Sequence, residues 1–155
     1  MAMSDPQIDP SAPGSKAAPD ASHRSRRWTH DARPRLWWHR LPGMDFVPPI
    51  YSDLTEAEWG LVRQWYDETD RAGLIGECAV PLISLLHGLV MSNRITQIVQ
   101  FGTCSGYSSL LLGFVLRRMN APNGLFTLEI DPQLCARTQS WLARAGLTNF
   151  VKWLN

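Results

Sequence analysis

The stretch that decides the fold is Ile95-Thr-Gln-Ile-Val-Gln-Phe-Gly-Thr-Cys-Ser-Gly-Tyr-Ser-Ser109. Its first part, residues 95–101, is rich in β-branched and aromatic residues and predicts a short strand. Gly102 to Gly106 predicts a turn, and residues 107–119 carry apolar side chains at helical spacing. In such a turn a ligand can approach the backbone closely, and the first N–H groups of the helix favour negative charge.

The alternation of strand and helix continues to the end of the sequence. Residues 125–130 predict a second strand, Asp131-Pro132 opens another helix that Gly146 closes, and residues 149–154 begin a third strand. Connections of this length predict parallel strands with right-handed crossovers. The fold class is therefore α/β, with a Rossmann-like parallel sheet of which three strands are visible.

The sequence divides the chain into three parts. Residues 1–50 form a basic, tryptophan-containing arm whose beginning has the composition of a disordered segment. Residues 51–94 hold two helices, one opened by the capping box Thr55-x-x-Glu58 and the other running from about Pro81. Residues 95–155 are the first half of the Rossmann-like domain.

Charge and composition exclude several classes of protein. The first 44 residues hold seven Lys/Arg against four Asp/Glu, and the remainder hold eight against ten, so a basic arm precedes a mildly acidic domain. This balance does not favour nucleic acid as a partner. No apolar run is long enough to span a membrane. Three cysteines without a Cys-x-x-Cys spacing indicate a reducing, cytoplasmic setting and no metal site.

A carboxylate points to the ligand that the turn would bind. Glu129 lies near the carboxyl end of the second predicted strand, at the edge of the sheet that faces the ligand crevice, where it can accept both hydroxyls of a ribose. The dinucleotide fingerprint needs a glycine where Cys104 stands, and another where Tyr107 stands. NAD or FAD is therefore disfavoured, and a nucleoside with a small carboxylate, such as S-adenosylmethionine, fits better.

Two segments resemble motifs of one family. Val99–Ser109 and Phe126–Pro132 are similar to the cofactor motifs of class I S-adenosylmethionine-dependent methyltransferases, in the group of the catechol and caffeoyl-coenzyme A O-methyltransferases. The resemblance covers about residues 75–155. It implies S-adenosylmethionine as cofactor and methyl transfer, to an oxygen of a small-molecule acceptor.

The resemblance also implies residue roles in the turn and the helix after it. Gly102 and Gly106 let the methionine part of the cofactor lie against the backbone. Tyr107 and Ser108 bind its carboxylate, through the backbone N–H of each and the Ser108 hydroxyl. Simple helix capping is the alternative for both residues.

The remaining roles concern the two strand ends. Glu129 accepts the ribose hydroxyls and Ile130 packs on the adenine. Gln100 stands where the family usually has an acidic residue, so its amide would meet the cofactor's amino group without charge assistance. The cofactor-binding candidates are therefore Gln100, Gly102, Thr103, Gly106, Tyr107, Ser108, Glu129 and Ile130.

The resemblance locates no catalytic residue in this sequence, and any divalent-metal ligands would follow the third strand. We therefore expect a fragment that binds the cofactor and is inactive alone. The alternatives are a non-catalytic protein-interaction module, favoured by an exposed apolar edge beside Ile98 and Phe101, and a less favoured NAD-dependent oxidoreductase. A homo-oligomer is left open.

Overall fold

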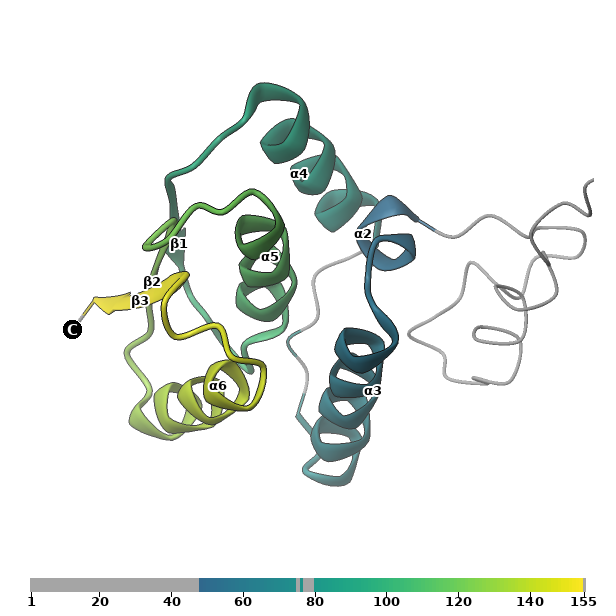
Figure 1. The fold of residues 1–155 in the computed structure, drawn as a ribbon. Coiled ribbons are helices and arrows are strands. Elements are labelled where there is room, and N and C mark those ends of the chain that lie inside the picture. The colour runs from purple at the N-terminus through teal and green to yellow at the C-terminus, as the bar shows by residue number, and fades with distance from the viewer. Residues whose placement is uncertain (1–47, 75, 77–79, 155) are drawn as a thin grey trace, which may run out of the picture. The chain divides into compact units, whose positions relative to one another are not determined.

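The computed structural model describes residues 48–74, 76 and 80–154. Its centre is a sheet of three parallel strands in the order β1-β2-β3, with a helix joining each strand to the next (Figure 1). The elements in chain order are α2 (Pro49–Ser52), α3 (Glu56–Arg71), α4 (Val80–Asn93), β1 (Ile98–Phe101), α5 (Tyr107–Arg118), β2 (Leu125–Leu128), α6 (Pro132–Arg144) and β3 (Val151–Leu154). The predicted α/β alternation and parallel sheet are confirmed.

The three strands end at one level. Phe101 pairs with Leu128, and Leu128 pairs with Leu154, so the last residues of β1, β2 and β3 form one row. The loops that follow the strands therefore leave from a shared edge. In open parallel sheets this carboxyl edge is where ligands bind.

The two faces of the sheet differ in burial. Leu125 and Thr127 of β2 are fully buried, whereas Val99 and Phe101 of β1 are 57% and 81% exposed. Successive side chains of a strand point to opposite faces, and α5 packs against β2. Within the described residues, the helices therefore cover one face and leave the other apolar and accessible.

Each strand is shorter than the sequence predicts. The expected strands at 95–101, 125–130 and 149–154 are each reduced to four residues. The ladder begins where the Ile98 N–H donates to the Gly124 carbonyl at 2.7 Å. It ends before Glu129, whose own carboxylate accepts from the N–H groups of Ile130 and Asp131 and turns the chain out of the sheet.

The segment before the first predicted helix also differs from expectation. The predicted arm reached residue 50, but Pro49–Ser52 forms the short helix α2, in which Ile50 and Tyr51 are buried. Proline is accepted in the first turn of a helix, where its missing N–H would have no partner. The rest of the predicted arm, residues 1–47, lies outside the described residues.

Charged side chains fix the N-terminal helices to the domain. Glu58, almost fully buried, lies 2.6 Å from Nη2 of Arg117 and 2.6 Å from Nη2 of Arg118 on α5. The predicted capping box is present, since Glu58 also accepts from the Thr55 N–H at 2.7 Å. Burial raises the pKa of Glu58, but the Thr55 N–H and the two guanidinium groups together hold it below its usual value.

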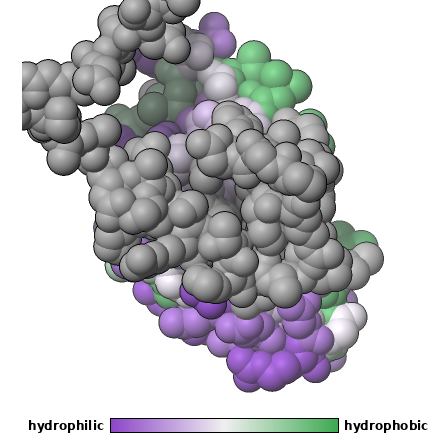
Figure 2. Space-filling model, turned by 90° about the vertical axis from the view of Figure 1, so that its right-hand side faces the viewer, coloured by the Kyte–Doolittle hydropathy of each residue, from purple (hydrophilic) through white to green (hydrophobic). Residues whose placement is uncertain are grey.

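Helix α4 keeps an apolar surface. Its Leu82, Leu85 and Leu89 are about half exposed, and hydrophobic residues gather near the top of Figure 2, at the height of α4 in Figure 1. His87 of the same helix is buried, and its Nε2 lies 3.1 Å from Asp53 Oδ2. None of the described helices combines the length and apolar character that crossing a bilayer requires.

Candidate functional site

The turn between β1 and α5 has an unusual backbone. Gly102 and Gly106 have φ values of +77° and +88°, and Cys104 between them has φ +51°. A side chain in the left-handed region is disfavoured by about 1–2 kcal/mol. The Cys104 N–H donates to Glu129 Oε2 at 2.8 Å, which holds this conformation against the end of β2.

The two glycines serve different purposes. A Cβ on Gly106 would lie 2.8 Å from Oγ1 and 2.9 Å from Cγ2 of Thr138, so α6 packs directly on this residue. A Cβ on Gly102 would meet no atom within 4 Å. Gly106 is therefore needed for packing inside the protein, while Gly102 borders open space into which a ligand could extend.

Glu129 links the turn to the start of α6. Its Oε2 accepts from Cys104, and its Oε1 accepts from the N–H groups of Ile130 and Asp131 at 2.9 and 3.2 Å. The Cys104 N–H, then the Asp131 N–H, lower the pKa of Glu129, so the group is a carboxylate at neutral pH. Oε1 already accepts two hydrogen bonds and Oε2 accepts one. Because each carboxylate oxygen can accept about two, Oε2 can also accept from a ligand hydroxyl.

A pocket of about 450 Å³ lies at the carboxyl edge of the sheet. Three of the predicted binding residues, Gly102, Glu129 and Ile130, line it, and the Ile130 side chain is 99% exposed. The other lining residues were not predicted: Phe101, Leu128 and Leu154. Each is the last residue of its strand. The predicted strand ends would have found Phe101 and Leu154, but the second strand was predicted to run to residue 130, so Leu128 was missed.

Gln100 does not line the pocket, and its amide is used inside the protein. Its Nε2 donates to Ser108 Oγ at 2.8 Å and to the Gly102 carbonyl at 3.3 Å. Its Oε1 accepts from Ser109 Oγ at 2.8 Å, and Ser109 is fully buried. Gln100 thus ties the end of β1 to the first turn of α5.

Thr103 is placed differently from the other candidates. Its side chain is buried, and its hydroxyl contacts Thr127 Oγ1 at 2.5 Å and the Leu128 carbonyl at 3.1 Å. Its N–H also bonds to the Leu128 carbonyl, at 3.2 Å. Thr103 therefore joins β1 to β2 and does not reach the pocket.

Tyr107 and Ser108 open α5, which has Gly106 as its N-cap and no side-chain cap within the described part of the chain. The first N–H groups of a helix lack acceptors within the helix and favour an anion. The Tyr107 side chain turns away from this end. Its hydroxyl contacts those of Tyr51 and Tyr66 in the interior, so only its backbone faces the predicted site.

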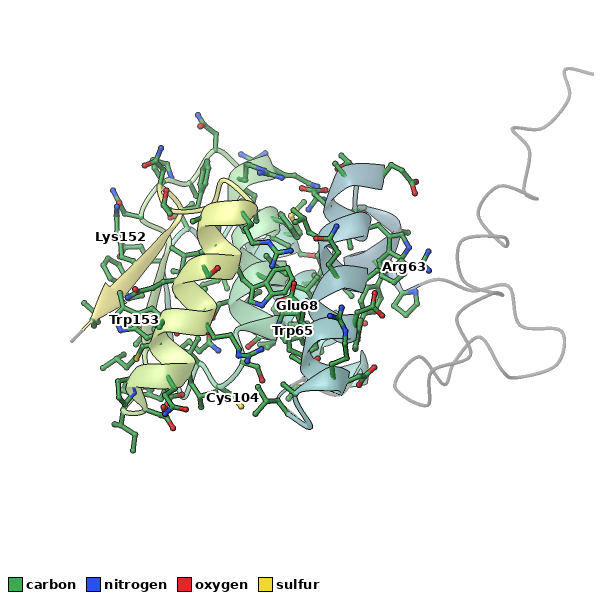
Figure 3. All side chains as sticks on the ribbon, turned by 90° about the horizontal axis from the view of Figure 1, so that it is seen from below. Arg63, Trp65, Glu68, Cys104, Lys152 and Trp153 are labelled. Atoms are coloured by element: carbon green, nitrogen blue, oxygen red, sulfur yellow. The ribbon has the colours of Figure 1, made fainter. Side chains whose placement is uncertain are left out.

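The N-terminal helices support the turn from behind. Trp65 Nε1 donates to the Ser105 carbonyl at 2.7 Å, and the Trp65 ring lies 5.0 Å from that of Tyr107. Figure 3 shows Trp65 pointing from α3 into the interior, while Arg63 points outward. A Cβ on Gly76 would overlap Ser105 Oγ, so the chain after α3 passes close to the turn. Sequence patterns do not reveal the bond between Trp65 and Ser105, because the two residues lie 40 positions apart.

The residues present fit an S-adenosyl ligand. The pocket offers apolar walls, one carboxylate at the end of β2 and open space at Gly102. The start of α5, which has no side-chain cap among the described residues, follows the same turn and favours an anion. No cluster of three or more His, Cys, Asp or Glu side chains suited to a metal ion occurs among residues 48–74, 76 and 80–154.

Comparison with solved structures shows that the described region has a Rossmann-like fold that also occurs in a methyltransferase. The S-adenosylhomocysteine-bound methyltransferase PaMTH1 of Podospora anserina matches 65% of this chain with TM-score 0.51 and 20% identity. The O-methyltransferase TomG of Streptomyces achromogenes, involved in tomaymycin synthesis and solved with S-adenosylmethionine, matches 65% with TM-score 0.47 and 30% identity.

This chain spans 42% of the first protein's length and 43% of the second's. No family model matches its sequence, and neither does any curated protein.

Proposed function

We propose that this chain binds S-adenosylmethionine and forms the cofactor-binding part of a methyltransferase. The observation that carries the proposal is the convergence of Gly102, Glu129 and Ile130 on one pocket at the carboxyl edge of the sheet. A fold that also occurs in an S-adenosylhomocysteine-bound methyltransferase supports it. When bound, the cofactor supplies an electrophilic methyl group.

Each residue of the site has a binding role in this proposal. The Glu129 carboxylate accepts a ribose hydroxyl while keeping its bond to Cys104, and Ile130 covers one face of the adenine. The N–H groups of Tyr107 and Ser108 bind the carboxylate tail, which passes the open side of Gly102. Among the described residues, Glu129 is the only ionisable one that lines the pocket, so these residues bind and orient the cofactor, and none is assigned the acceptor chemistry.

The acceptor is proposed from the sequence resemblance. The Gly-Tyr-Ser ending of the glycine-rich motif at Gly106 to Ser108 resembles the O-methyltransferase group, and we propose an oxygen of a small molecule as the site of transfer. The cytoplasm is the proposed setting, and neither nucleic acid nor a membrane is a proposed partner.

The test is thermal unfolding of this chain with and without S-adenosylhomocysteine, with NAD as the control ligand. A ligand that binds only the folded state raises the melting temperature. We expect S-adenosylhomocysteine to raise it, NAD to leave it unchanged, and Glu129→Ala to abolish the rise. Glu56→Ala, which removes an exposed carboxylate on α3, serves as the matched control and should keep it. No rise in the unsubstituted chain would refute the proposal.

A protein-interaction module is the second candidate, and one observation favours it. Val99 and Phe101 are exposed on β1, which is an edge strand of the described sheet. Exposed apolar edge strands pair readily with other chains. Sedimentation velocity over a range of concentrations distinguishes the two functions, because an interaction module should self-associate through this edge whether or not S-adenosylhomocysteine is present.

A further inference from the structure

The carboxylate of Glu129 has little acceptor capacity left for a ligand. Its Oε1 accepts from the N–H groups of Ile130 and Asp131 at 2.9 and 3.2 Å, and its Oε2 accepts from the Cys104 N–H at 2.8 Å. A carboxylate offers about four acceptor positions, about two on each oxygen. The backbone therefore occupies Oε1 fully and Oε2 in part, so the acceptor position that faces the pocket belongs to Oε2.

The two oxygens of Glu129 are bonded to different segments of the chain. Oε2 is bonded to Cys104, in the turn between Gly102 and Gly106, whereas Oε1 is bonded to the two residues that lead into α6. The free acceptor position is therefore on the oxygen that is bonded to the glycine turn. The oxygen bonded to Ile130, the residue proposed to cover the adenine, is fully used.

The covalent order of a ribose matches these two oxygens to its two hydroxyls. Carboxylates at this edge of an open α/β sheet bond ribose hydroxyls. The 2′-hydroxyl is next to the carbon that carries the base, and the 3′-hydroxyl is next to the carbon that carries the tail. In the proposed function the base meets Ile130 and the tail passes Gly102. A ligand placed in this way brings its 3′-hydroxyl toward Oε2 and its 2′-hydroxyl toward Oε1 of Glu129.

We propose that Glu129 selects ligands by the ribose 3′-hydroxyl and does not distinguish a 2′-hydroxyl from a 2′-hydrogen. The inference rests on the proposed function and names the ligand class of that site as S-adenosyl compounds together with their 2′-deoxy counterparts. A bond from the 2′-hydroxyl to Oε1 would have to displace the N–H of Ile130 or Asp131. One hydrogen bond to a carboxylate that replaces another yields little net binding.

The experiment is isothermal titration calorimetry of this chain with S-adenosylhomocysteine, its 2′-deoxy analogue and its 3′-deoxy analogue. The 2′-deoxy analogue should bind within about threefold of S-adenosylhomocysteine, because it loses no bond to the protein. The 3′-deoxy analogue should bind at least about tenfold more weakly than the 2′-deoxy analogue, since it loses a hydrogen bond to a charged group. A loss of more than about threefold for the 2′-deoxy analogue, or a ratio below about tenfold between the two analogues, overturns the inference.

Glu129→Gln tests the assignment to this side chain. The amide removes the charge and one acceptor oxygen, so the loss of affinity caused by the missing 3′-hydroxyl should shrink to about threefold or less. Glu56→Gln makes the same carboxylate-to-amide change at an exposed position of α3, and it should keep a loss of at least about tenfold. An undiminished loss in Glu129→Gln overturns the role of Glu129. The two analogues decide the inference in the unsubstituted chain even if Glu129→Gln does not fold.

These outcomes separate the inference from the proposed function. If S-adenosylhomocysteine binds and the two deoxy analogues bind equally, only the selectivity of Glu129 for the 3′-hydroxyl is removed. Failure of all three probes to bind removes the proposed function, and the inference with it.

Discussion

Replacing Gly106 by alanine tests the packing of the glycine turn against α6. The added methyl would lie 2.8 Å from Thr138 Oγ1 and 2.9 Å from Thr138 Cγ2, well inside van der Waals contact. Overpacking of this kind destabilises by about 1–3 kcal/mol. The backbone adds a second effect, since φ is +88° and alanine is disfavoured there by about 1–2 kcal/mol. We expect the free energy of unfolding to fall by about 2–5 kcal/mol in total.

Gly102→Ala is the matched control for the backbone effect. Its φ is +77°, but its Cβ would meet nothing within 4 Å, so only about 1–2 kcal/mol should be lost. The steric effect should couple Gly106 to Thr138, and Gly106→Ala should be less destabilising in a Thr138→Ala background.

The assay is urea denaturation followed by circular dichroism, in which a shift of midpoint at constant slope reports stability. Equal destabilisation by Gly106→Ala and Gly102→Ala, or no coupling with Thr138→Ala, would refute the packing argument.

Two further predictions concern the attachment of α3. Trp65→Phe removes the bond to the Ser105 carbonyl and replaces a fully buried indole by a smaller ring, so we expect a loss of about 2–4 kcal/mol of stability and a weaker thermal shift with S-adenosylhomocysteine. A full-sized thermal shift would contradict a supporting role for this residue. Glu58→Gln breaks the pairs with Arg117 and Arg118 and should destabilise by about 2–4 kcal/mol near neutral pH. Because the folded state lowers the pKa of Glu58, its contribution is present above the unfolded value of about 4.3 and is lost as the pH falls through the folded pKa. Urea midpoints from pH 7 down to pH 3 should therefore converge for the two proteins, and a constant gap would refute the electrostatic origin.

Much of the fold was predictable because its signals are local. The capping box at Thr55 and Glu58, the Asp131 cap of α6 and Gly146 after α6 each act within a few residues. They place helix ends without knowledge of the rest of the chain. Strand ends depend on the partner strand and on side chains such as Glu129, so all three strands were predicted too long.

The site was predictable only in part, for a related reason. Gly102, Glu129 and Ile130 stand at loop positions whose place follows from the strand order, and the structure brings them together. Thr103 lies in the same turn, but its hydroxyl is drawn into the β1–β2 interface by Thr127, a residue 24 positions away. A motif gives the positions of residues along the chain, whereas their orientation depends on distant partners.

All three tyrosines of the sequence meet at one point of the described structure. Tyr51 from α2 and Tyr66 from α3 both contact the hydroxyl of Tyr107, the first residue of α5. Burial raises the pKa of Tyr107 well above its usual value, and the neighbouring Tyr66 and Tyr51 raise it further. The unfolded chain therefore ionises first as the pH rises above about 10, and the folded state loses stability in that range. Because the chain has no tyrosine elsewhere, its tyrosinate absorbance would follow the opening of this single junction and nothing else.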